Sequence, residues 1–201
     1  SIEKIDFALS TATAKNNRLF KNVDGIKFLN HTGGCGGTRQ DAAVLGKLLA
    51  AYADHPNVAG ITVLSLGCQN LQVQDFLNDL KQRNPQFDKP LLIYEQQQSK
   101  SEPELIAEAI RETFIHLIEV NKAERKDAPL SKLCVGVKCG GSDSFSGISA
   151  NPAVGHCADL VVGLGGQILL AEFPELCGAE QDLIDRSVNE PVARKFMKLM
   201  T

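Results

Sequence analysis

The chain has 201 residues, of which 43% are hydrophobic and 22% are charged. This length and balance fit one ordinary α/β domain, or two very small ones, and argue against a disordered or low-complexity chain. Twenty-one lysines and arginines stand against 24 aspartates and glutamates, and the net charge of -3 argues against a nucleic-acid binder held by bulk electrostatics. No apolar stretch has the length of a membrane span, and the first residues have no signal or transit pattern. We therefore expect a cytoplasmic protein that binds neither nucleic acid nor membrane.

Strand-like apolar runs alternate with segments of helical period, which is the pattern of a parallel sheet with crossover helices. Strands are expected at 26–30, 58–66, 91–94, 133–137 and 168–171. Helices are expected after a capping box at Thr38, after Asn70, from Ser101 to about Asn121, from Asn151 to about Gly163, and after Pro174 and Pro191, with a further helix within 1–20. The prediction is a single α/β domain over 1–201, with a mainly parallel sheet of about five strands and helices on both faces, in a Rossmann-like three-layer arrangement.

Six cysteines and clustered glycines are the less ordinary features of this composition. In a reducing compartment, cysteines serve as buried thiols or metal ligands more often than as a disulfide frame. Four glycines surround Cys35 and two follow Cys139. Because glycine allows the backbone to approach a ligand closely, these two loops are candidates for a binding site.

Ligands of open α/β sheets bind at the carboxyl ends of the strands, so the residues at those ends are informative. In strand order, these ends carry His31 and Cys35, then Cys68, then Glu95, then Cys139 and Asp143, and finally Glu172 and Glu175. The other cysteines, Cys134, Cys157 and Cys177, are expected in the interior. A purely structural role stays open for every cysteine, because a free cysteine most often packs as a small apolar side chain.

Residues 139–147, CGGSDSFSG, form the densest polar segment and precede the helix start at Asn151-Pro152. Hydroxyl groups and backbone N–H groups in such a loop suit a carboxylate or a phosphate. Common alternatives are absent from the chain: there is no P-loop, no G-x-S-x-G and no C-x-x-C. Arg39 occupies the position where a dinucleotide fingerprint beginning at Gly34 needs its third glycine.

Four motifs together resemble the altronate dehydratase (altronate hydrolase) and galactarate dehydratase family. They are HTGGCG at 31–36, LGC at 66–68, CGGSDSFSG at 139–147 with Asn151-Pro152, and EFPE at 172–175. The resemblance covers about residues 25 to 190 and departs from the family pattern at Gln69, where many members carry an acidic residue. Because family members are longer, the resemblance implies an internal catalytic-domain fragment.

The resemblance implies dehydration of a sugar acid, of the altronate or galactarate type, to a 2-keto-3-deoxy acid. It also implies a divalent metal, usually iron. Removal of a proton next to a carboxylate creates an enolate, which a metal stabilises as a Lewis acid while it polarises the leaving hydroxyl. We expect iron, as Fe²⁺ or an iron–sulfur cluster, or else Mn²⁺.

On this hypothesis, the cysteines that follow strands bind the metal ion. A histidine and an aspartate act as general base and general acid, and the two glycine-rich loops bind the substrate. The metal ligands are Cys35, Cys68 and Cys139; the general base and acid are His31 and Asp143; the substrate-binding residues are Gly34, Arg39, Ser142, Ser144, Ser146 and Asn151.

Two other functions and one other state remain open. A metal-independent hydrolase would use Cys35 or Cys139 as its nucleophile with His31, and a small-anion binding module would hold a sugar acid without turnover. A lone fragment would fold with an incomplete, metal-free and inactive site. A homo-oligomer is also left open.

Overall fold

The computed structural model describes residues 19–31, 33–141 and 143–200. The helix expected within 1–20 lies almost wholly outside these residues. Contacts between Cα atoms group the chain into two compact units, Ser1–Arg125 and Lys126–Thr201. This grouping does not test whether the chain is a single domain, so that expectation stays a prediction. None of the helices in the described part of the chain combines the length and the apolar character needed to cross a lipid bilayer.

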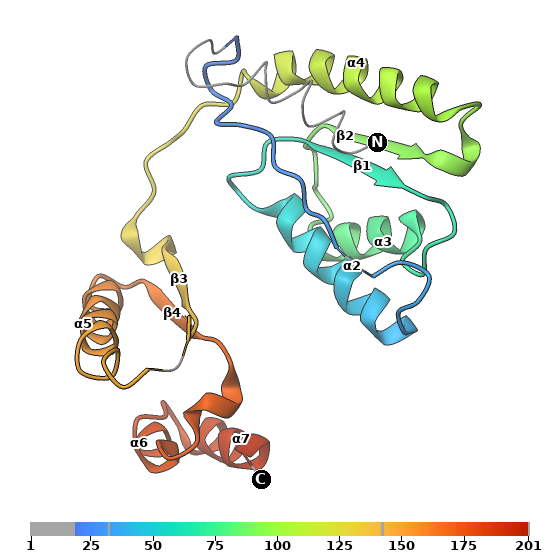
Figure 1. Cartoon of the computed structure of the whole chain (residues 1–201). Helices are drawn as coiled ribbons and strands as arrows, with labels where there is room; N and C mark the ends of the chain where they lie inside the picture. The colour runs from blue at the N-terminus through green and yellow to red at the C-terminus, as the bar shows by residue number, and fades with distance from the viewer. Residues whose placement is uncertain (1–18, 32, 142, 201) are drawn as a thin grey trace. The chain divides into compact units, whose positions relative to one another are not determined.

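The first unit has three layers built on two parallel strands, β1 (Ile61–Ser65) and β2 (Leu91–Glu95). Helices α2 (Arg39–Asp54) and α3 (Val73–Arg83) pack on one side of this sheet, and α4 (Glu102–Val120) packs on the other (Figure 1). Side chains alternate along a strand, so each strand contributes to both cores. The expected helices on both faces are therefore confirmed for this unit.

Two apolar clusters cover the two faces of the first sheet. The first is centred on the buried residues Ala50, Ala53, Phe76 and Leu80, against which Ile61, Val63 and Leu91 pack. The second is centred on Ala109 of α4, against which Leu64 and Tyr94 pack together with Ile26 and Phe28. The opposite-face positions of Val63 and Leu64 follow from the two-residue period of a strand.

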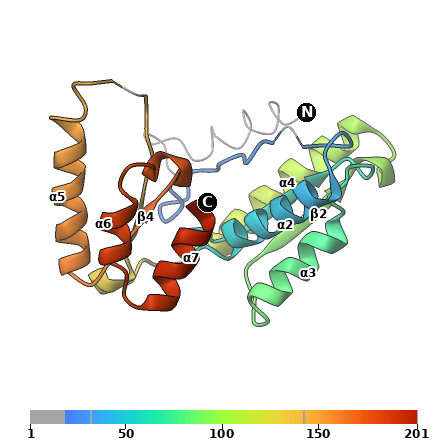
Figure 2. The same ribbon diagram turned by 90° about the horizontal axis from the view of Figure 1, so that it is seen from below.

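The second unit repeats the strand–helix–strand pattern on a smaller scale. Strand β3 (Cys134–Val137) pairs in parallel with β4 (Gln167–Leu170), and α5 (Ala150–Gly163) connects them. Helices α6 (Glu180–Asp185) and α7 (Glu190–Met200) follow, and both figures show them side by side (Figures 1 and 2). An edge-to-face contact between Phe173 and Phe196, with ring centroids 5.4 Å apart, attaches α7 to the segment after β4.

The expectation of one sheet of about five strands is wrong for the described residues, which form two separate two-stranded sheets. The segment predicted as a strand at 26–30 is not assigned to a strand. Ile26 and Phe28 pack against the Ala109 cluster. Their apolar side chains therefore contribute to the core although this segment forms no β-sheet hydrogen bonds. An extended segment becomes a strand only where a neighbouring backbone offers hydrogen-bond partners.

Local signals in the sequence place the two longest helices correctly. Thr38 and Asp41 form a reciprocal capping box at the start of α2, with Thr38 Oγ1 accepting from the Asp41 N–H at 3.1 Å. The hydrogen bonds from Thr38 hold the pKa of the Asp41 carboxyl below its ordinary value. Ser101 accepts a hydrogen bond from the Glu104 N–H at the start of α4, where Pro103 fits the first turn.

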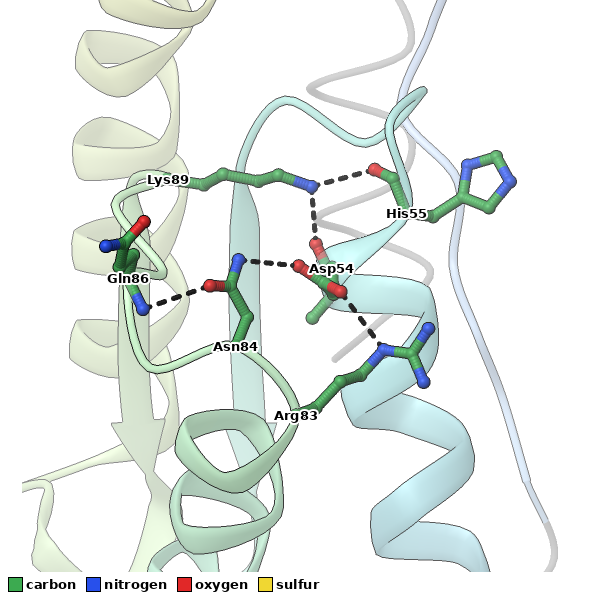
Figure 3. Close-up of polar contacts among 7 residues, drawn as sticks. Asp54, His55, Arg83, Asn84, Gln86 and Lys89 are labelled. Carbon is green, nitrogen blue, oxygen red and sulfur yellow. Dashed lines mark hydrogen bonds and ion pairs between the residues drawn. The ribbon is translucent and has the colours of Figure 1, made fainter. Parts of the chain in front are cut away.

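A polar network fixes the end of α2 that lies far from its capping box (Figure 3). Lys89 Nζ donates to the carbonyl oxygens of Ala53 and His55 at 2.9 and 2.7 Å, which satisfies acceptors that the helix end leaves free. Asp54 accepts from Arg83 Nε at 3.1 Å and from Asn84 Nδ2 at 2.9 Å. The network therefore joins the ends of α2 and α3 and has a structural role.

Candidate functional site

The glycine-rich loop before α2 and the loop after β1 meet through their cysteines. The Sγ atoms of Cys35 and Cys68 are 3.8 Å apart, and the Cys35 thiol also donates to the Cys68 carbonyl oxygen at 3.1 Å. Both residues are exposed. The hydrogen bond with Cys68, together with its charge, raises the pKa of the Cys35 thiol. The two sulfurs thus form a close pair at the carboxyl end of β1.

Asn70 holds these two loops together. Its side-chain amide donates to the carbonyl oxygens of Cys35, at 3.3 Å, and Gly37, while its backbone N–H donates to the Gly34 carbonyl oxygen at 3.3 Å. The sequence predicts Asn70 as a helix cap, and this prediction is wrong: α3 begins at Val73, after Gln72. The same amide group can cap a helix or bridge two loops, and its partners decide which.

The turn that presents Cys68 is itself well defined. Gly67 has a φ of 101°, a region that favours glycine, and a Cβ atom there would lie 2.9 Å from Gln97 Oε1. The Gly67 N–H donates to Gln69 Oε1 at 2.8 Å, and Gln69 Nε2 donates to the buried Ser65 hydroxyl at 2.7 Å. Gln69, the departure from the family pattern, therefore shapes this turn.

A surface pocket of about 420 Å³ is lined by residues of the loop that contains Cys35, although neither Cys35 nor Cys68 is among the lining residues. Its lining includes His31, the glycines at 33, 34 and 37, and Asn70. The N-terminal end of α2 contributes Thr38 and Asp41. Of the residues predicted to act on the substrate, His31 and Gly34 thus line one pocket, and Arg39 is the first residue of the adjoining helix.

Cys139 lies in the second unit, at the carboxyl end of β3, and has its own group of neighbours. One ligand atom from each of Cys139, Glu172 and Glu175 lies within 4.8 Å of the other two. Lys138 Nζ forms an ion pair with Glu172 Oε1 at 3.2 Å. The other oxygen, Glu172 Oε2, is buried and accepts no hydrogen bond from the described residues. One thiol and two carboxylates can together bind a divalent metal ion.

Glu172 owes its position to an unusual backbone. Its φ and ψ are 61° and 63°, the left-handed region, and it is the one non-glycine residue with a positive φ among the described residues. It caps the short 3₁₀ helix Phe173–Leu176, which also carries Glu175. The sequence placed both glutamates at a strand end but assigned them no role. The signal in the sequence is their position shortly after β4, which pairs with β3, the strand that Cys139 follows.

The polar loop after Cys139 is folded on itself. Asp143 Oδ1 accepts from the Ser146 N–H at 2.8 Å, and the Ser146 hydroxyl donates to the Asp143 carbonyl oxygen at 2.9 Å. The Asn151 N–H donates to the Ser146 carbonyl oxygen at 2.8 Å. Ser144 is exposed in the same turn, and Ser142 lies outside the described residues. Asp143 and Ser146 therefore order the start of α5, whatever else they bind.

The three cysteines predicted in the interior are not there. Cys134, Cys157 and Cys177 are exposed in the second unit, whereas Cys139 is half-buried. The prediction rested on the general tendency of free cysteine to be buried. That tendency needs a deep core, and no described residue of this unit is among the buried ones.

Each unit thus carries thiol or carboxylate groups on loops that follow parallel strands, which is where open α/β folds bind small molecules. Two family models match the chain: "D-galactarate dehydratase/Altronate hydrolase, second domain" over residues 3–121, and "D-galactarate/Altronate dehydratase, C-terminal" over residues 130–201. The chain belongs to the D-galactarate dehydratase/altronate hydrolase family, which confirms the resemblance inferred from the motifs.

Three curated relatives give the same result. An altronate dehydratase of Bacillus subtilis is 37% identical over 88% of this chain and 34% of its own length. An altronate dehydratase of Escherichia coli is 33% identical over 90% of this chain and 35% of its own length. A galactarate dehydratase (L-threo-forming) of Escherichia coli is 34% identical over 73% of this chain and 28% of its own length. The chain thus spans about a third of the relatives that it matches.

Proposed function

We propose that this chain supplies part of the active site of a sugar-acid dehydratase. The reaction would remove water from an altronate- or galactarate-type acid and yield a 2-keto-3-deoxy acid. Family membership and the names of the relatives support the reaction class. The observation that carries the proposal in the structure is the Cys35–Cys68 pair, whose loop also contributes His31 and Gly34 to a surface pocket.

The donor set is compatible with a divalent transition-metal ion, and the family resemblance makes iron the proposed one. The Cys35 and Cys68 sulfurs are 3.8 Å apart, so both thiolates could bind the same metal ion. Cys139, with Glu172 and Glu175, offers a second set that mixes one sulfur with oxygens. When bound, iron supplies a Lewis acid for the carboxylate and hydroxyl oxygens of the substrate. The proposed ligands are therefore Cys35, Cys68 and Cys139, with the two glutamates as additional candidates.

The remaining steps are assigned to side chains of this chain. His31 would take the proton from the carbon next to the substrate carboxylate, since histidine is the most common general base in enzymes. Asp143 would protonate the departing hydroxyl group. The Arg39 guanidinium would pair with a substrate carboxylate, with two parallel hydrogen bonds. The Gly34 backbone, the serine hydroxyls of the loop before α5 and the side chain of Asn151 in the first turn of α5 would bind substrate hydroxyl groups; the serines are Ser142, Ser144 and Ser146.

The test uses the full-length polypeptide that contains this sequence, loaded with Fe²⁺ without oxygen. Altronate, galactarate and related aldonates and aldarates are offered, and the 2-keto acid product is measured. We expect turnover that a chelator abolishes. Activity that survives the chelator but is lost on thiol alkylation would instead show a metal-independent enzyme that depends on a cysteine. Substrate binding without product from any acid would identify a binding module.

Cysteine variants test the ligand assignment. Cys35→Ser, Cys68→Ser and Cys139→Ser should each lower the iron content and the turnover, because a hydroxyl group is a much poorer ligand than a thiolate. Cys157→Ser is the matched control, since Cys157 is exposed on α5 and belongs to neither group of donors. Full iron content and activity in all three ligand variants would show that the assignment is wrong. Wild-type turnover by His31→Ala would remove His31 from the mechanism.

A further inference from the structure

The two thiols of the first unit are close enough to react with one another. Their sulfurs are 3.8 Å apart and belong to residues that are both exposed, so a small oxidant in solution has access to them. A disulfide has an S–S distance of about 2.05 Å. The sulfurs therefore need to approach by about 1.8 Å, which rotation of the two side chains and a small loop shift can provide.

The surroundings allow this shift while they keep the pair together. A Cβ atom on Gly34, Gly36 or Gly37 would meet nothing within 4 Å, so the loop on either side of Cys35 has open space. The hydrogen bonds of Asn70 to the backbone of this loop prevent the opposite movement, in which the loop would leave Cys68. The loop can thus close on Cys68 without unfolding the sheet.

We propose that Cys35 and Cys68 are a redox-active pair that hydrogen peroxide converts into a reversible disulfide. One thiolate attacks a peroxide oxygen, the O–O bond breaks, and the departing hydroxide takes a proton to become water. The second sulfur then attacks the resulting sulfenic acid, the S–O bond breaks, and a second water leaves. Two thiols and one peroxide therefore give one disulfide and two waters. A dithiol reductant reverses the step by exchange.

The formation of the disulfide does not depend on the proposed dehydratase function, but its consequence does. A sulfur in a disulfide is no longer a thiolate, and only the thiolate is a good metal ligand. If Cys35 and Cys68 bind iron, their oxidation releases the metal and stops turnover until the pair is reduced. The oxidised state would then protect the two sulfurs from further, irreversible oxidation.

The test uses the reduced 201-residue chain in the presence of a chelator, treated with one equivalent of hydrogen peroxide. After the remaining thiols are blocked, the intact mass should show four blocking groups and the loss of two hydrogens, about 2 Da, whereas the reduced chain with its six cysteines carries six blocking groups. Peptide mapping should find Cys35 linked to Cys68. Cys157→Ser should form the same link to the same extent. Cys35→Ser and Cys68→Ser should lack it and accumulate oxygen on the remaining thiol.

Asn70→Ala tests whether positioning controls the reaction. We expect linkage to slow by about tenfold, because the loss of the side-chain hydrogen bonds allows the Cys35 loop to leave Cys68. Oxidation of Cys35 and Cys68 one at a time to sulfinic acids, with no link in the wild-type chain, would overturn the proposal. Iron content is measured separately on reduced and oxidised chains. Equal content in both would show that the thiols are not iron ligands, while the disulfide would stand.

Discussion

Gly46 allows α2 and α3 to pack closely, and its replacement by alanine gives a sharp test of this packing. Gly46 is a buried residue in the middle of α2. A Cβ atom at this position would lie 2.5 Å from Asp79 Oδ2 of α3 and 3.0 Å from Leu71 Cδ1. The first distance is too short for any contact between these atom types, so the Asp79 carboxylate would have to move.

Two opposing effects set the size of the change. Alanine is better than glycine in a helix interior by about 1 kcal/mol. Overpacking of a close contact costs about 1–3 kcal/mol. We therefore expect Gly46→Ala to lower the free energy of unfolding by about 0–2 kcal/mol, although alanine is the better helix former. In the Asp79→Ala background the carboxylate is gone, and the same substitution should be neutral or stabilising by up to about 1 kcal/mol.

The assay is urea unfolding of the wild-type chain, the two single variants and the double variant, followed by tyrosine fluorescence. The chain has no tryptophan, and its two tyrosines, Tyr52 and Tyr94, both belong to the first unit. The signal therefore reports on the unit that contains Gly46. The reasoning is refuted if the effects of the two single substitutions add within about 0.5 kcal/mol, or if Gly46→Ala alone gives the full gain of alanine.

Three further predictions concern the same unit and use the same fluorescence. Leu80→Ala should lower the free energy of unfolding by about 2–5 kcal/mol, because Leu80 is 3% exposed in the cluster between α2, α3 and the sheet; a loss below 1 kcal/mol would contradict this core. Gly67→Ala should cost about 1–3 kcal/mol, because φ is 101° and Gln97 blocks the new methyl group; an unchanged midpoint would contradict it. The hydrogen bond from Asn84, and to a lesser extent Arg83, holds the pKa of the Asp54 carboxyl below its ordinary value, although desolvation opposes this. Asp54 therefore stabilises the fold above its unfolded pKa of about 4, and this stability is lost as the pH falls through the lower folded pKa. Asn84→Ala should reduce the loss of stability between neutral and acid pH, and an unchanged pH dependence would show that Asn84 is not the cause.

The elements with local signals could be predicted from the sequence. The capping box at Thr38 and the Ser101–Pro103 start depend on residues within one turn, and the structure contains both. The extended segment that begins at Ile26 could not be assigned correctly, because strand formation depends on a backbone partner that is distant in the sequence. For the same reason, the sequence indicated parallel pairing but not how many strands share a sheet.

In the candidate site, too, features set by local sequence could be predicted, whereas features that depend on distant residues could not. The position of Cys35 and Cys68 after expected strands indicated that they could meet, and the structure has them 3.8 Å apart; their role as ligands stays a prediction. The bridging role of Asn70 could not be predicted, because it depends on carbonyl groups 33 and 35 residues away. The exposure of Cys134, Cys157 and Cys177 could not be predicted either, because the burial of a cysteine depends on the depth of the core around it.

Under the proposed function, the left-handed backbone of Glu172 sets the stability of the second unit against metal binding at a single position. A non-glycine residue in this conformation costs about 1–3 kcal/mol, and glycine would relieve much of that cost. Glycine, however, removes the carboxylate next to Cys139. Glu172→Gly should slow hydrogen exchange of the β3 and β4 amides, and faster exchange would contradict the strain. Under the proposed function, a screen for thermal stability alone would select glycine here and discard a metal ligand.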